Sequence, residues 1–373
     1  MIRSALALTA LTVSTGVAQA GGIDRSGTPI DIIFEEGNYA TLSYGYADPS
    51  LTGVDQEGAN VRNIAAGFGL VGVALKLDIA ENVSLAFILD EPYGVDVEYG
   101  PESAVLGGTL ADAESYGITT LVRYQATDRI SVYGGPRFVR AKGQINLGGN
   151  AYFLDGYESN FASDTGTGYV IGAAYEIPDI AFRAALTYHS EIDLSFDTTE
   201  TFPASAASIP FPLPTGVPVP TGTTNTTLPQ SIKLAVQSGI ATDTLVFGSV
   251  RWVDHDVFMV IPPVFPENLA SLDSSITYEL GIGRRFSERF SARASVIYED
   301  VLADDLVSPL TPTSGFTALS IGGQYQLTEA LDISGGIRYT WLKDATAEVS
   351  DSVVGEFRNN DVVSFGLKLG VRF

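Results

Sequence analysis

Val-Ser-Phe-Gly-Leu-Lys-Leu-Gly-Val-Arg-Phe, residues 363–373, ends the chain. Apolar side chains occupy every second position, and serine, glycine, lysine or arginine fills each position between them. Successive side chains of a strand point to opposite faces, so this segment presents one apolar face and one polar or small face. This alternation and the terminal Phe373 are typical of the last strand of an outer-membrane barrel. They predict an all-β transmembrane antiparallel β-barrel.

The same alternation recurs at residues 116–124, 180–189 and 331–341. In a barrel wall the lipid contacts the apolar set, while the polar set faces a lumen that water can reach. Tyrosines fall near the ends of several segments, where the interfacial aromatic girdles of such barrels lie. The pattern therefore predicts a wall with lipid on one side and water on the other.

The N-terminus resembles an export signal. Arg3 precedes a mainly apolar run over residues 5–13, and Ala18-Gln19-Ala20 follows it. The run is too short to span a bilayer, and the small residues match a signal-peptidase cleavage site. We expect residues 1–20 to be a signal peptide and the mature protein to reside in the outer membrane of a Gram-negative cell.

Composition narrows the class further. After the signal, no window offers the roughly 18 to 20 apolar residues that a transmembrane helix needs. The chain has 39 glycines, 17 tyrosines and 19 phenylalanines, which suit strands, turns and aromatic belts. The lack of cysteine excludes a disulfide scaffold and a thiolate metal site. A net charge of −23 argues against a nucleic-acid partner, because the phosphates would be repelled.

Connections of two lengths alternate along residues 38–373, and they predict about fourteen strands. Short polar turns lie near residues 78–82, 126–129, 177–179, 241–244, 285–289 and 328–330. Long loops cover roughly residues 48–63, 100–114, 143–166, 191–230, 255–273, 301–315 and 343–360. A barrel of this size has a lumen that is either water-filled or plugged. We expect residues 21–37 to fold back as a short internal plug, the alternative being a disordered periplasmic leader.

Three of the long loops are unusually apolar. The proline-rich 191–230 loop predicts a stiff, non-helical flap, and the 143–166 and 255–273 loops add further aromatic residues. Such loops either offer an apolar groove to a ligand or pack together as a rigid cap. The candidate groove residues are Tyr152, Phe153, Leu154, Phe161, Phe202, Ile209, Phe211 and Leu213.

One predicted strand is interrupted by Asp90-Glu91-Pro92-Tyr93-Gly94. Proline and glycine inside a strand mark a bulge or kink, because proline breaks the hydrogen-bonded ladder. Asp90, Pro92 and Gly94 are therefore candidates for a kink that opens a side gap from the lumen to the bilayer. The alternative is an ordinary strand end that enters a loop.

Candidate polar sites are few. Basic residues predicted on the lumen face could meet a carboxylate, although wall arginines occur in any porin; they are Arg123, Arg137, Arg183, Arg251, Arg293 and Arg338. The two histidines are His189 and His255, and we expect His255 to be a solvated loop residue rather than a metal ligand or base. No G-x-S-x-G or H-E-x-x-H pattern occurs, so we expect no catalytic residue, metal or cofactor.

Together these features resemble the long-chain fatty-acid transporter (FadL/TodX, OMPP1) family of outer-membrane proteins. The likeness rests on the strand count, the segment before the first strand, the interrupted third strand at residues 89–94, two large apolar loops, and residues 228–234 entering strand eight. It implies passive uptake of hydrophobic molecules, most of all long-chain fatty acids. The ligand would pass from a loop groove to a pocket in the barrel and leave at the strand-three kink. The Asn-Pro-Ala element of the family's hatch is missing from residues 21–37, which puts gating by a hatch in doubt.

Other functions stay open at this point. A general diffusion porin for small hydrophilic solutes is the main alternative, and a wall enzyme or a purely structural barrel are two more. For the transporter we expect a hydrophobic small-molecule ligand, contact with outer-membrane lipid, no nucleic acid and a monomeric state.

Overall fold

The computed structural model describes residues 23–27, 29–204, 206, 215–265, 267–270, 272–303 and 306–373. The expected signal peptide, residues 1–20, lies outside this part. So do three of the candidate groove residues, Ile209, Phe211 and Leu213. No helix in the described part is long and apolar enough to cross a membrane.

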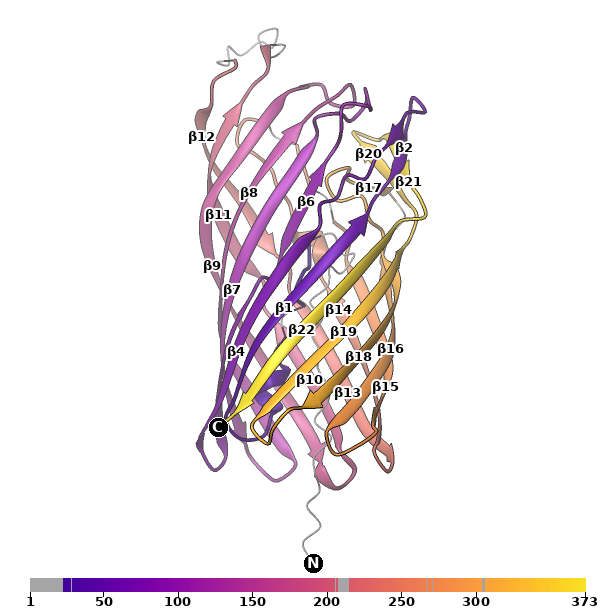
Figure 1. Cartoon of the computed structure of the whole chain (residues 1–373). Coiled ribbons are helices and arrows are strands. Elements are labelled where there is room, and N and C mark those ends of the chain that lie inside the picture. Colours follow the sequence, from indigo (N-terminus) through magenta and orange to yellow (C-terminus); the bar gives the residue numbers. More distant parts are fainter. Residues whose placement is uncertain are drawn as a thin grey trace, which may run out of the picture.

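The wall is one antiparallel sheet closed into a cylinder (Figure 1). Its 17 labelled strands include three pairs that continue one another, β5 with β6, β10 with β11 and β12 with β13, and 17 − 3 gives a 14-strand barrel. In chain order these strands are β1 (Tyr39–Ser50), β4 (Phe68–Ala80), β5 (Val83–Asp90), β6 (Gly94–Glu98), β7 (Leu110–Gln125), β8 (Ile130–Leu147), β9 (Tyr157–Ile177), β10 (Phe182–His189), β11 (Ile192–Thr201), β12 (Val219–Leu228), β13 (Ser231–Ala241), β14 (Thr244–Val253), β15 (Ser275–Arg285), β16 (Phe290–Val301), β18 (Phe316–Gln326), β19 (Leu331–Leu342) and β22 (Asp361–Arg372). The predicted fold class is confirmed.

The first and last wall strands close the barrel. β1 pairs with β22 from Tyr39↔Arg372 to Ser50↔Asp361, and β22 also pairs with β19. On β22 the residues from Val363 to Val371 alternate as predicted, with the apolar side chains exposed on the outer face and Ser364 fully buried inside. Closure pairs the first wall strand with the last, so neither leaves a free edge to the lipid.

The strands continue well beyond the membrane at one end, here called the long-loop end (top of Figure 1). β9 has 21 residues, whereas about 9–11 residues cross a bilayer. Beyond the membrane the inner face of the wall is apolar and the outer face is polar, the reverse of the arrangement within the membrane. On β11, Ile192, Leu194 and Phe196 are buried inside, while Asp193 and Asp197 are exposed outside.

The structure corrects the prediction that residues 143–166 and 191–230 are loops. Much of each segment lies in paired strands, β8 with β9 and β11 with β12. The outer surface is wet there, so the polar positions of a strand turn outward and the apolar positions turn inward. Leu194, Phe196 and Leu228 form part of the inner lining of this extended wall, whereas the proline-rich residues 207–214 lie outside the described part of the chain.

A small second sheet lies at the long-loop end, beside the wall (Figure 1). Its strands come from three of the predicted loops and are β2 (Gly53–Asp55), β3 (Asn60–Val61), β17 (Leu306–Val307), β20 (Ala345–Val349) and β21 (Ser352–Phe357). Tyr99 packs its ring edge-on against Phe357 at 6.2 Å and donates a hydrogen bond to the carbonyl of Pro309 at 2.7 Å. These contacts give the barrel a packed cap on one side of its rim.

Residues 23–37 lie in the lumen, where they form the short helix η1 (Asp31–Phe34). The other short helices are η2 (Pro178–Ile180) and η4 (His255–Val257). Ile33 is fully buried, and the Phe34 ring packs edge-on against Tyr133 at 5.4 Å. Near the opposite end from the long loops, Arg372 of the last strand pairs with Glu35 at 3.1 Å. The segment is thus attached to the inner wall by both apolar and charged contacts.

The exchange of faces gives a direct prediction on a single wall strand, β12–β13. Leu234→Arg places a charge on the lipid-facing side and should lower the free energy of unfolding by about 2–4 kcal/mol if it lies near the bilayer midplane. Thr223→Arg puts an arginine on the outer face beyond the membrane, opposite Asp197. This variant should change the free energy of unfolding by less than about 0.5 kcal/mol. Urea unfolding in lipid vesicles measures both, and equal losses would contradict the assigned membrane boundary.

Candidate functional site

An apolar cavity of about 100 Å³ lies inside the barrel toward the long-loop end. The inward faces of several wall strands form most of its lining, and the 258–270 loop and Ile23 complete it. Its apolar lining residues are Ile23, Tyr93, Val95, Ala111, Ala113, Ala141, Ile145, Phe161, Leu194, Phe196, Leu228, Phe258, Val260, Ala270 and Leu310. Such a lining binds ligands through the removal of apolar area from water rather than through polar contacts.

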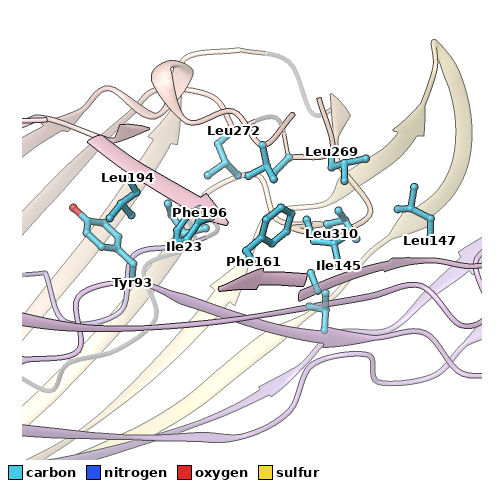
Figure 2. Packing of buried hydrophobic residues seen from close by; sticks show 14 of the residues in the cluster. Ile23, Tyr93, Ile145, Leu147, Phe161, Leu194, Phe196, Leu269, Leu272 and Leu310 are labelled. Atoms are coloured by element: carbon cyan, nitrogen blue, oxygen red, sulfur yellow. The ribbon is translucent and has the colours of Figure 1, made fainter. Parts of the chain in front are cut away.

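The cavity sits within a larger apolar cluster (Figure 2). Figure 2 shows side chains from wall strands and from the 255–273 loop pointing toward one another. Phe161 and Phe196 have ring centroids 6.1 Å apart, while Tyr157 stacks on Phe265 at 5.0 Å and contacts Phe202 at 5.5 Å. Aromatic pairs of this kind contribute beyond their buried area, so the cluster holds the loop over the cavity.

One buried carboxylate fastens this loop to the wall. Glu200 is fully buried at the end of β11 and accepts a hydrogen bond from the Tyr157 hydroxyl at 2.6 Å. It also accepts backbone hydrogen bonds from Val264 and Phe265, each at 3.2 Å. A carboxylate with three donors is satisfied without a neighbouring cation, and it fixes the loop at the point where the loop covers the cavity.

The structure separates the candidate groove residues that it describes. Leu154, Phe161 and Phe202 are buried in the apolar cluster, and Tyr152 packs against it, but only Phe161 lines the cavity. Phe153 is 84% exposed and belongs to neither, because it lies in the tight connection between β8 and β9 and projects to solvent. Its exposure gives no support to a place in the predicted groove.

The sequence alone did not predict most of the residues that line the cavity. Leu194, Phe196 and Leu228 lie in a segment interpreted as a loop, and Ile145 near the edge of another. A usable signal exists on β11, where apolar residues alternate with Asp193, Ser195 and Asp197. That alternation reads as a strand with its apolar face inward once the outer medium is taken to be water.

Below the cavity lies a group of charged and polar side chains. Asp24 is buried and its Oδ2 is 2.6 Å from Nη1 of Arg251, while Nε2 of His255 lies 4.0 Å from the same oxygen. The guanidinium of Arg137, itself buried, lies 5.5 Å from the ring centroid of Tyr93. Since Tyr93 and Ile23 line the cavity, these charges lie directly beneath its apolar lining.

The electrostatics of this group follow from burial and proximity. Burial alone would raise the pKa of Asp24, but the positive charge and hydrogen bond of Arg251 outweigh burial and hold this pKa below its ordinary value. Burial lowers the pKa of His255, which favours a neutral ring. The prediction of a solvated His255 is wrong, because its side chain is buried in η4. In the described part of the chain no cluster of His, Asp and Glu is placed to hold a metal ion.

The other lumen arginines lie at different positions. Arg123 and Arg183 place their guanidinium groups 4.9 Å and 4.3 Å from the ring centroid of Phe34, so they contact the N-terminal segment. Arg293 lies 5.6 Å from the Phe247 ring. Arg338 lies on β19 between the exposed Ile337 and Tyr339, so it also faces inward. Of the six candidates, Arg137 and Arg251 are the ones that the structure brings together with Tyr93 beneath the cavity.

The third wall strand is broken between β5, which ends at Asp90, and β6, which begins at Gly94. β4 pairs with β5 as far as Val73↔Leu89, and the next bridge on this side is Ala65↔Val97. The wall between these two pairs therefore has no continuous ladder.

The N-terminal segment fills this break. The backbone N–H of Gly94 donates to Ile23 and that of Arg25 donates to Pro92, both at 2.8 Å, while Ser26 donates to the Asp90 carboxylate. A Cβ on residue 94 would lie 2.5 Å from the Arg25 guanidinium, so a larger residue there would require the Arg25 side chain to move. That guanidinium also lies 4.2 Å from the centre of the Phe68 ring on β4. Residues 23–26 thus close the gap in the wall.

Comparison with known proteins gives consistent relatives. Residues 36–373 match the family described as outer membrane protein transport protein (OMPP1/FadL/TodX). Outer membrane protein P1 of Haemophilus influenzae is 21% identical over 323 residues, which cover 76% of this chain and 68% of that protein.

Solved structures share the fold. A FadL homologue of Pseudomonas aeruginosa superposes with a TM-score of 0.74 at 15% identity, covering 92% of each chain. The toluene transporter TodX of Pseudomonas putida gives a TM-score of 0.67 at 12% identity, again over 92% of each chain. The toluene transporter TbuX of Ralstonia pickettii gives 0.63 at 13% identity, over 91% of this chain and 90% of that one.

The attachment of the loop to Glu200 is testable. Glu200→Ala leaves the Tyr157 hydroxyl and two backbone N–H groups without their acceptor, which costs about 1–3 kcal/mol for each group that stays buried and unpaired. We expect the 258–270 loop to be cleaved by protease at least several-fold faster in folded barrels. Glu158→Ala, at an exposed position of the same rim, is the matched control and should leave the rate unchanged. Equal cleavage of both variants would show that the aromatic packing alone holds the loop.

Proposed function

Since the chain belongs to the OMPP1/FadL/TodX family of outer-membrane transport proteins, we propose that it carries hydrophobic compounds passively across the outer membrane. The long-loop end is then extracellular. The observation that carries the proposal is the apolar cavity, which is built mainly from inward-facing side chains of the wall strands.

Capture is driven by the apolar lining. Each Å² of apolar ligand surface removed from water contributes roughly 25 cal/mol, so a hydrocarbon chain gains several kcal/mol even after the cost of immobilising it. A general diffusion porin needs a polar constriction lined with charges. The lining here is apolar at the extracellular end, and the N-terminal segment crosses the lumen below it, which supports the hydrophobic conduit over the porin.

We propose long-chain fatty acids as the substrate class. Arg251 and Arg137 lie beneath the cavity, where a carboxylate head would find positive charge while the chain stays in the apolar lining. The cavity is small, about 100 Å³, and it takes a segment of a chain at a time. Several relatives of the same fold are described as toluene transporters, so a monoaromatic hydrocarbon is the second candidate, and a ring fits the cavity without a charged partner.

Release would use the break in the third wall strand. Residues 21–37 act in this proposal as the plug, with Ile23–Arg25 closing the gap between β4 and β6. Asp90, Pro92 and Gly94 shape the gap, and movement of the N-terminal segment would open a lateral path to the bilayer. We further propose that residues 1–20 are cleaved on export and that the barrel acts as a monomer in outer-membrane lipid.

Uptake of a labelled long-chain fatty acid tests the function. Cells that lack their own transporter should take it up several-fold faster with this protein than without it, while entry of small sugars should not change. Toluene, given in parallel, distinguishes the second candidate. Faster sugar entry without faster fatty-acid entry would mean an aqueous pore and would reject the proposal.

The role of the cavity is tested by filling it. Ala141 lies in the lining, and Ala141→Trp should occupy the space and lower fatty-acid uptake by about tenfold without removing any apolar group. Phe153→Ala, at the solvent-exposed position, should leave uptake within about twofold.

Phe211→Ser together with Leu213→Ser tests the proline-rich part of the groove, where we expect weaker uptake with barrel assembly intact. Heat-modifiability on a gel confirms folding of each variant.

Uptake that is unchanged by Ala141→Trp would exclude the cavity from the path.

A further inference from the structure

Ile23 and Asp24 together have the chemistry of a bound amphiphile. The Ile23 side chain lies in the apolar lining of the cavity, and the adjacent Asp24 carboxylate lies on Arg251 below it. The pair thus places one apolar group and one carboxylate where an apolar tail and an anionic head would lie. The chain itself supplies both groups, from a segment outside the wall strands.

The site under Asp24 has donor capacity that Asp24 does not use. Its Oδ2 lies 2.6 Å from Arg251 but 4.0 Å from Nε2 of His255. Neither ring nitrogen of His255 has a hydrogen-bond partner among the described residues, although the side chain is only 1% exposed. A buried polar group without a partner is costly, so a carboxylate placed slightly nearer His255 would bond both residues.

The segment that carries Asp24 is bonded to the wall at the strand break and at Arg251. Backbone hydrogen bonds join Ile23 to Gly94 and Arg25 to Pro92, and Ser26 bonds Asp90. On the far side of the lumen, Asp24 pairs with Arg251 on β14. Loss of that pair would remove a charged contact across the lumen and would leave the hydrogen bonds at the strand break, the place where residues 23–26 fill the gap in the wall.

We propose that Asp24 acts as an internal substitute for the carboxylate of the ligand, and that an amphiphile with an apolar tail and an anionic head enters by displacing it from Arg251. This inference rests on the proposed function and deepens it, because it assigns the head group to Arg251 and His255. Ligand binding then releases the segment that closes the wall. A neutral hydrocarbon of the same length gains the apolar contacts but does not compete with Asp24.

Binding of laurate and 1-dodecanol, which share a twelve-carbon chain and differ in the head group, tests the inference. The purified protein in phosphatidylcholine nanodiscs is titrated with each radiolabelled ligand, and empty nanodiscs give the background. Asp24→Asn removes the internal carboxylate and should raise the affinity for laurate about tenfold, while that for dodecanol stays within about twofold. Asp31→Asn, in the same segment, is the matched control and should change neither affinity.

The double variant Asp24→Asn, Arg251→Gln separates the head-group site from loosening of the segment. It should lose the gain for laurate and keep the affinity for dodecanol. A single cysteine in this cysteine-free chain reports the movement itself. Ile23→Cys should react several-fold faster with a thiol reagent in the presence of laurate, and no faster with dodecanol.

The outcomes distinguish the inference from the function beneath it. If Asp24→Asn leaves laurate affinity unchanged, or raises both affinities equally, Asp24 does not compete with the ligand head, and the inference fails while hydrophobic uptake stands. If neither ligand binds to the wild type or to any variant, the proposed function fails and the inference fails with it.

Discussion

Every backbone N–H and C=O group within the bilayer must find its hydrogen-bond partner in the protein, because lipid offers none. The rest of this structure depends on that constraint. The pairing of β1 with β22 along all of β1 satisfies it by closing the wall. The exception among the described strands is the break between β5 and β6, where the ladder to β4 stops. Backbone groups of Ile23 and Arg25 supply bonds there, so the N-terminal segment completes the wall as well as occupying the lumen.

A change of solvent along the same strands produces the cavity. Within the membrane the outer face must be apolar and the lumen takes the polar residues. Beyond the membrane the outer face meets water, so Asp193 and Asp197 turn outward and Leu194 and Phe196 turn inward. The apolar lining of the cavity at the long-loop end therefore follows from the water outside the wall there. It lies where a hydrophobic compound would arrive, above a lumen with charged walls.

Charged contacts, in addition to apolar packing, connect the N-terminal segment to the walls. Glu35 pairs with Arg372 at one end, and Asp24 pairs with Arg251 near the cavity. Buried ion pairs contribute little net stability because desolvation offsets their attraction. A buried ion pair can therefore be replaced by another pair with the same charges at a small cost in free energy. That property suits a segment that must hold the wall closed and yet release it.

The sequence by itself determined the barrel. Period-two alternation is a local pattern, so residues 363–373 and their counterparts predicted which side chains meet lipid and which face the lumen, and the alternation of turns and loops predicted the number of strands. The same local pattern could not show where the membrane ends, because an inverted strand such as β11 has the alternation of any half-buried strand. Only the tertiary structure decided which inward residues meet. It brought Ile23 to Phe161 and Leu310 in one cavity and Asp24 to Arg251, because barrel closure joins strands that are far apart in the chain.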